Sequence, residues 1–132
     1  MKNDNNKDKT TEDYLEAMLI LKEKNGYVRS IDVAAQLNVT KPSVTYTTKR
    51  LRERGLITMD RDNFIQITED GMEIANKTYK RHVLLKNFFM RLGVPDKIAE
   101  EDACKVEHDL SAETFDALCA HVEKYDWIKT EE

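Results

Sequence analysis

Apolar residues recur three and four positions apart through most of this chain, which is the pattern of helices that bury one face. The pattern predicts six helices, near residues 10–24, 31–37, 41–54, 68–92, 95–110 and 111–122. Residues that favour helix starts stand where each helix is expected to begin. They are Thr10 or Thr11, Ser30, Thr40, Thr68, Pro95 and Ser111.

Two short β-like runs, Leu56–Met59 and Phe64–Ile67, interrupt the helical pattern. They flank the polar stretch Asp60–Asn63 and predict a β-hairpin with Arg61 in its tip. The two short helices before the hairpin are joined by a tight turn at Asn38–Val39, which predicts a helix-turn-helix. A helix-turn-helix followed at once by a hairpin is a winged helix. We therefore expect a mainly α protein with an N-terminal winged helix-turn-helix, a short β-hairpin wing and a C-terminal helical domain.

Three segments follow from this pattern. Residues 1–9 are polar and lack apolar periodicity, which predicts a disordered leader. Residues 10–72 form the predicted DNA-binding domain, and residues 73–132 form the helical domain. The last three helices carry more apolar surface than one small half-domain can cover, so we expect a homodimer.

Composition places the chain among cytoplasmic proteins with free thiols. The 132 residues contain no signal peptide at the N-terminus and no apolar run long enough to span a membrane. Two cysteines, Cys104 and Cys119, do not make a disulfide framework.

The formal net charge of −4 hides a strong asymmetry. Residues 41–61 contain six basic and two acidic residues, a local charge of +4. Residues 96–132 contain twelve acidic residues and four lysines, a local charge of −8. The first region suits phosphate and the second suits cations.

The predicted second helix of the helix-turn-helix has a surface fit for DNA. It combines phosphate donors with short hydroxyl side chains that can reach base edges. The exposed positions are expected to be Lys41, Ser43, Thr45, Tyr46, Lys49 and Arg50. Arg61, in the wing, is a further candidate for a phosphate contact.

A separate stretch predicts metal chemistry. In a helix, Cys104, Glu107 and His108 share one face because they stand three and four residues apart. A thiol, a carboxylate and an imidazole together suit iron, manganese, zinc or cobalt better than calcium or magnesium. Spacing alone does not decide the matter, since a buried cysteine beside solvated neighbours gives the same pattern.

The chain resembles the metal-dependent repressors of the diphtheria toxin repressor and manganese transport regulator family, in a two-domain form without the SH3-like domain. The resemblance covers nearly everything from Thr11 to Trp127. The stretches that carry it are residues 11–16 (TEDYLE), 41–45 (KPSVT), 52–57 (RERGLI), 81–85 (RHVLL) and 102–108 (DACKVEH), with Ser111.

The resemblance implies a regulator of metal homeostasis in which Fe(II) or Mn(II) locks a homodimer into a DNA-binding geometry. Zn(II) or Co(II) is expected to substitute in vitro, and the operator is expected to be a palindromic double-stranded DNA. The implied metal ligands are Asp13, Glu16, His82, Cys104, Glu107 and His108. The implied contacts to base edges are Thr40, Pro42, Ser43 and Tyr46.

Tyr46 departs from the family pattern because it is bulkier than the glutamine of iron-type members, so the preferred operator need not match theirs. Four other residues bear on the metal. Cys104 is the choice of iron-responsive members, whereas Asp13 is the choice of manganese-responsive ones, so the metal stays open between the two. Lys86 stands where members often have a glutamate near a second metal, and Glu100 stands where the iron type has histidine. A second metal site is therefore expected to be missing, or to be built differently with Glu100 or Glu101.

The sequence allows two alternatives to a metal-dependent repressor. A winged-helix regulator that senses redox through Cys104 would need only a reactive thiol. A metalloenzyme would need an open coordination position and a placed base or nucleophile, and no such motif is present. We therefore expect no enzymatic activity.

Overall fold

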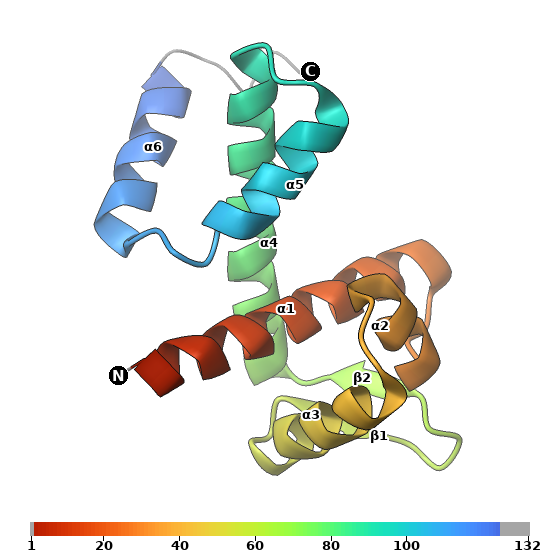
Figure 1. Ribbon diagram of the computed structural model, residues 1–132. Coiled ribbons are helices and arrows are strands. Elements are labelled where there is room, and N and C mark those ends of the chain that lie inside the picture. The colour runs from red at the N-terminus through yellow and green to blue at the C-terminus, as the bar shows by residue number, and fades with distance from the viewer. Residues whose placement is uncertain (1, 125–132) are drawn as a thin grey trace. The chain divides into compact units, whose positions relative to one another are not determined.

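The computed structural model describes residues 2–124, with side chains described from residue 9 on, and the chain divides into two compact units (Figure 1). The boundary lies between Lys77 and Thr78, inside the long helix α4 (Glu69–Arg91), a few residues beyond the predicted boundary at residue 72. The predicted end of the second domain and the end of the resemblance at Trp127 lie outside the described residues.

The first unit is a winged helix, as predicted. It contains a helix-turn-helix between a long first helix and a two-stranded antiparallel hairpin. Its elements are α1 (Lys2–Asn25), α2 (Ser30–Leu37), α3 (Lys41–Glu53), β1 (Ile57–Met59), β2 (Ile65–Ile67) and the first part of α4.

The core of the first unit is made of the apolar stripes that the sequence pattern picks out. Each helix gives one buried face, and each strand gives one fully buried isoleucine. The largest side chains with less than 2% exposure in these elements are Leu15, Met18, Val33, Val44, Leu51, Ile57 and Ile65. Burial of side chains of this size stabilises a fold by about 1.5–3 kcal/mol each.

The wing is a short hairpin held by its own tip and by the segment before α2. Ile57 pairs with Ile67, and Met59 pairs with Ile65. At the tip, the carboxylate of Asp60 accepts hydrogen bonds from two backbone N–H groups, those of residues 62 and 64. Ile65 donates its backbone N–H to the Val28 carbonyl oxygen over 2.8 Å, which ties the hairpin to the chain that precedes α2.

The structure differs from the prediction at two helix starts. Helix α1 begins at Lys2, so the residues expected to be a disordered leader are helical from Lys2 on. Adding a residue to an existing helix costs far less than starting one, and no proline or glycine interrupts residues 2–9. Helix α2 is preceded by Arg29 in an extended conformation, and Ser30 is its first residue rather than its cap.

The second unit packs the rest of α4 with α5 (Asp96–Val106) and α6 (Ala112–Lys124). Its buried apolar side chains are Leu84, Leu85, Ala99, Ala103, Phe115 and Val122. Arg81 connects the three helices: its guanidinium lies 5.0 Å from the centre of the Phe115 ring. The same group donates to the backbone carbonyls of Glu107 and Leu110, over 3.1 and 3.0 Å.

Helix α5 is shorter than predicted. It ends at Val106, and residues 107–109 form a turn, whereas the apolar pattern predicted a helix to about Leu110. The Arg81 guanidinium donates to the backbone carbonyls of Glu107 and Leu110, and so supplies hydrogen bonds to the segment that follows α5. No helix in the described part of the chain has the length and apolar content needed to cross a membrane.

Candidate metal centre and DNA-binding surface

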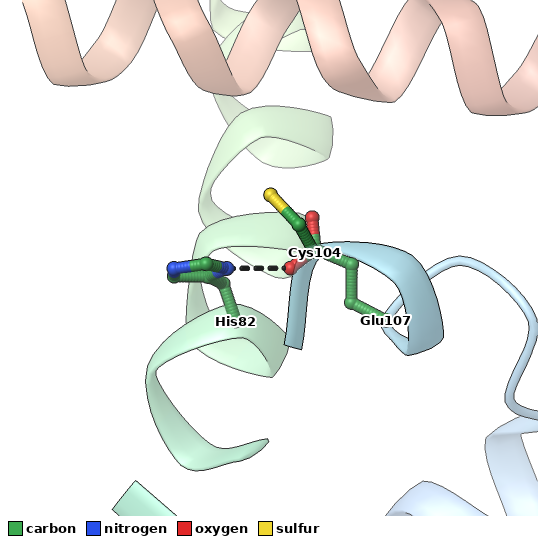
Figure 2. A group of neighbouring side chains, drawn as sticks. All are labelled: His82, Cys104 and Glu107. Atoms are coloured by element: carbon green, nitrogen blue, oxygen red, sulfur yellow. Dashed lines mark hydrogen bonds and ion pairs between the residues drawn. The ribbon is translucent and has the colours of Figure 1, made fainter. Parts of the chain in front are cut away.

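Three potential metal ligands converge in the second unit. Their ligand atoms, on His82, Cys104 and Glu107, all lie within 4.8 Å of one another (Figure 2). His82 projects from α4, Cys104 lies in the last turn of α5, and Glu107 is the residue that caps α5. The backbone N–H of Glu107 still bonds to the Ala103 carbonyl oxygen, so Cys104 and Glu107 keep the shared face that the sequence predicts.

Glu107 is a buried carboxylate between two imidazoles. Its side chain is fully shielded from solvent. One oxygen, Oε1, lies 2.8 Å from His82 Nδ1, and the other, Oε2, lies 3.3 Å from His108 Nε2. His108 stands in the turn after α5 rather than in the helix, yet it still reaches Glu107. A buried carboxylate is costly unless it is paired, so this position needs a positive partner.

His82 uses both of its ring nitrogens. Nδ1 faces Glu107, while Nε2 lies 2.9 Å from Glu100 Oε2. Hydrogen bonds to Cys104 and Glu107 raise the pKa of His82 to about 11, against the lowering effect of burial. At neutral pH the ring is therefore an imidazolium that donates from both nitrogens.

Lys86 pairs with the Glu100 oxygen that does not face His82. Its Nζ is 3.1 Å from Glu100 Oε1 and 3.5 Å from Asp96 Oδ1. Burial by itself would raise the pKa of Glu100, but the hydrogen bonds from Lys86 and His82 outweigh burial and lower it. Of the two acids considered for a second metal, Glu100 is thus engaged by two cations and Glu101 is exposed.

The donor set fits a divalent transition metal. An imidazole nitrogen, a thiol sulfur and a carboxylate oxygen are mixed ligands of the kind that iron, manganese, cobalt and zinc accept. The positive partner that Glu107 requires is at present the proton on His82, and a metal ion would take its place. Metal binding must then release that proton, because only a neutral imidazole is a ligand.

Asp13 and Glu16 belong to the first unit. Both lie on α1, three residues apart, so they share a face of that helix. Of the six predicted ligands, the structure brings His82, Cys104 and Glu107 together within the second unit, and His108 lies beside Glu107. The part that Asp13 and Glu16 take in metal binding stays a prediction.

The DNA-binding surface predicted on α3 is exposed. Thr40 caps the helix by accepting a hydrogen bond from the Ser43 backbone N–H, as expected. Its hydroxyl also donates to the Ser43 hydroxyl over 3.0 Å, so these two predicted base-reading groups fix each other. Predicted DNA-contacting positions with exposed side chains are Thr40, Lys41, Pro42, Ser43, Thr45, Tyr46, Lys49, Arg50 and Arg61.

Tyr46 and Arg50 form a pair on the outer face of α3. Tyr46 is 63% exposed, although large aromatic side chains are usually covered. The Arg50 guanidinium lies 5.6 Å from the centre of the Tyr46 ring and donates to its hydroxyl over 3.4 Å. The pair therefore presents a flat, positively charged surface.

Two basic residues that the sequence analysis did not single out join this surface. A groove of about 590 Å³ between α3 and the hairpin is lined by Arg29 and Arg52, among others. The Arg29 guanidinium lies about 6 Å from the ring centres of Tyr27 and Phe64. Arg29 pairs with Phe64 through an isolated β-bridge, which no periodic pattern in the sequence predicts.

Comparisons with known proteins agree with the two units. Residues 8–63 match the family described as the iron dependent repressor N-terminal DNA binding domain. Residues 68–126 match the iron dependent repressor metal binding and dimerisation domain.

Individual relatives are regulators. The transcriptional regulator MntR of Escherichia coli O6:H1 is 37% identical over 114 residues, which are 86% of this chain and 74% of that protein. The manganese regulator SloR has a solved structure with a TM-score of 0.75 and 25% identity, covering 86% of this chain and 53% of that one.

IdeR of T. acidophilum supports the fold alone. Its structure gives a TM-score of 0.77 at 24% identity, over 87% of this chain and 53% of that one. This chain therefore spans about half the length of these solved relatives. The two family matches together confirm the predicted recognition and exclude the enzyme alternative, and this chain belongs to the iron-dependent repressor family of metal-dependent transcriptional regulators.

Proposed function

We propose that this protein is a repressor of metal-homeostasis genes in which Fe(II) or Mn(II), held by His82, Cys104, Glu107 and His108 with Asp13 and Glu16, sets the DNA affinity of a homodimer. The observation that carries the proposal is the buried Glu107 carboxylate, which lies between two imidazoles and beside a thiol. A bound divalent ion would supply a fixed double positive charge and coordinate side chains from both units.

Each ligand has a distinct part in this proposal. Glu107 and His108 come from the turn after α5, and Cys104 from the helix itself, so binding at this end would order the turn. His82 anchors the set to α4, the helix that runs through both units. Asp13 and Glu16 would connect α1, and with it the winged helix, to the same ion.

The metal-free ligands of the second unit are partly neutralised by a proton. A cluster of acids and a thiol would repel one another without metal. In the metal-free protein, however, the imidazolium of His82 already neutralises Glu107. A metal ion must therefore displace a proton from His82 to bind at Glu107.

DNA binding by this account depends on the spacing of two winged helices. Two recognition helices of a dimer must lie about 34–36 Å apart to enter successive major grooves of a palindromic operator. The second unit offers exposed apolar side chains for dimer contact: Leu92 is 62% exposed, Ile98 48% and Met90 39%. We infer a cytoplasmic location, which fits a dimer that binds chromosomal DNA.

The choice between iron and manganese rests on two ligands of different character. Cys104 is soft and favours Fe(II), Co(II) or Zn(II), while Asp13 is hard and suits Mn(II). Cys104→Glu should therefore shift relative affinity toward Mn(II). Isothermal titration under anaerobic, reducing conditions would measure the ratio of Mn(II) and Co(II) affinities in both proteins.

The coupling between the units is tested by Asp13→Ala. This variant should fold, retain the second-unit ligands and lose metal-dependent DNA binding. Glu12→Ala, which removes a neighbouring acid from the same helix, is the matched control. DNA binding by Asp13→Ala that still rises with metal as in the wild type would refute the proposed role of α1. A parallel titration with and without reductant separates metal sensing from a redox response of Cys104.

A further inference from the structure

A side-chain network extends from the metal ligands to a lysine. His82 and Lys86 stand four residues apart on α4, so they share one face of that helix. Glu100, on α5, reaches both of them: Oε2 lies 2.9 Å from His82 Nε2, and Oε1 lies 3.1 Å from Lys86 Nζ. Asp96, at the start of α5, adds a second carboxylate 3.5 Å from the same ammonium.

Glu100 has both of its oxygens committed in this arrangement. Oε2 accepts from His82 Nε2, the ring nitrogen that does not face Glu107. Oε1 is paired with the Lys86 ammonium. A ligating histidine commonly donates its other ring N–H to a carboxylate, which sets the tautomer and the ring orientation. His82 fits that scheme, with Nδ1 toward Glu107 and Nε2–H toward Glu100.

Lys86 supplies the cation that faces Glu100 and Asp96. Its side chain is 27% exposed, and it faces two carboxylates at ion-pair distance. A lysine side chain is covalently tethered, so its positive charge stays in this position at any metal concentration. A second divalent ion at Glu100 and Asp96 would have to displace the ammonium and break two ion pairs.

We propose that Lys86 is a positioning residue of the metal centre: its ammonium holds Glu100 on His82 and takes the place of a second ion, so that each protomer binds one divalent metal. This inference rests on the proposed function, because it assumes that His82, Cys104 and Glu107 bind metal. It goes further by assigning a role to Lys86, Glu100 and Asp96 and by fixing the stoichiometry.

The first test counts ions per protomer. Equilibrium dialysis against Mn(II) or Co(II), under reducing conditions, should give one ion per protomer for the wild type. Lys86→Glu removes the ammonium and adds a carboxylate beside Glu100 and Asp96, so the count should rise to two. Lys86→Arg keeps the cation and should stay at one. Lys80→Glu, the same charge change at an exposed position of α4, is the matched control and should also stay at one.

Cobalt absorption shows where the added ion binds. The ion bound to Cys104 gives a thiolate-to-cobalt band, and the added ion in Lys86→Glu lies among carboxylates and should not increase it. Two ions in Lys86→Glu with an unchanged thiolate band per protomer would support the proposal. Circular dichroism of each variant establishes that it is folded.

A second variant tests the orienting role and does not depend on Lys86→Glu folding. Glu100→Ala leaves the four ligands in place but removes the carboxylate that sets the His82 ring. We expect its affinity for the single ion to fall by about 10–100-fold, the usual effect of losing such a partner. Affinity equal to that of the wild type would overturn this part of the proposal.

The number of ions bound also distinguishes a failure of the role given to Lys86 from a failure of metal sensing. Two ions in the wild type, or one ion in a folded Lys86→Glu, would overturn the role given to Lys86 while leaving metal sensing intact. No ion in the wild type would overturn the proposed function, and this inference with it.

Discussion

At the residue scale, Glu107 is the position on which the proposed metal centre depends. Its identity as a ligand candidate could be predicted from its spacing to Cys104, because the two stay on one helical face. Its burial and its position between two imidazoles could not, because His82 is 25 residues away in sequence and comes from another helix. Spacing patterns report neighbours on one element, not partners across elements.

Glu107→Gln should abolish stabilisation by metal. An amide keeps the shape of the side chain but removes the charge that a cation needs. The wild type at a metal concentration 100-fold above its Kd should gain about 2.7 kcal/mol in free energy of unfolding. The variant should gain almost none in the same thermal denaturation experiment. Glu113→Gln, at an exposed position of α6, should behave like the wild type, and a full metal response of Glu107→Gln would contradict its role.

The stability of the metal-free protein should depend on pH through His82. Its pKa is raised from 6.5 to about 11 in the folded state, so its stabilising effect is complete below pH 6.5 and is lost as the pH rises toward 11. Between pH 7 and 9 the folded protein binds more protons than the unfolded one, and the free energy of unfolding should fall. The limiting slope for one group is about 1.4 kcal/mol per pH unit.

Urea denaturation with chelator at several pH values measures this slope. His82→Gln should have a clearly smaller slope than the wild type over pH 7–9. His121→Gln, at an exposed position of α6, is the control and should retain the wild-type slope. Equal slopes for the wild type and His82→Gln would show that His82 is not the group responsible.

At the element scale, the number, order and type of helices and strands follow from the sequence, because each buried stripe is local. Thr40, Thr68 and Ser111 also cap their helices as predicted, with side-chain oxygens that accept backbone N–H groups. The observed bounds differ from the predicted ones in two helices. Helix α5 ends at Val106 and is followed by a segment that accepts hydrogen bonds from Arg81 of α4, and α1 extends to Lys2 although residues 2–9 lack an apolar stripe.

Gly71 marks a close approach between α4 and the wing. A Cβ at this position would meet the Leu56 carbonyl oxygen and the Ile67 side chain. Helix propensity alone would make Gly71→Ala stabilising by about 1 kcal/mol. We expect the steric conflict to dominate and to destabilise the protein by about 1–3 kcal/mol. Asn76→Ala, at an exposed position of α4, gains helix propensity without a conflict, and a stabilised Gly71→Ala would contradict the packing described here.

Arg61 in the wing tip should contact the DNA backbone rather than the bases. Arg61→Met should then weaken binding to all operator sequences about equally. It should also reduce the slope of log affinity against log salt by about 0.9, the value for one lost phosphate contact. Lys97→Met removes a positive charge from the second unit and should leave the slope unchanged. A loss confined to particular bases would contradict a phosphate contact.

At the scale of the whole molecule, charge and chemistry are divided between the two units. The basic stretch that the sequence places at residues 41–61 lies on α3 and the wing, where its arginines and lysines are exposed. The candidate metal ligands of the second unit lie in the acidic half of the sequence or face it. A regulator needs these two activities to be coupled, and α4 runs through both units.

The central claim is that metal raises DNA affinity, and fluorescence anisotropy tests it most directly. The probe is a labelled duplex selected from a random pool in the presence of Mn(II), and the protein is anaerobic and reduced. Salt is held constant, because phosphate contacts make affinity steeply salt-dependent. Binding is measured with chelator and then with Mn(II), Fe(II) or Co(II). The account predicts an increase of at least about tenfold with metal, within the usual range of allosteric coupling, and equal affinity with and without metal would contradict it.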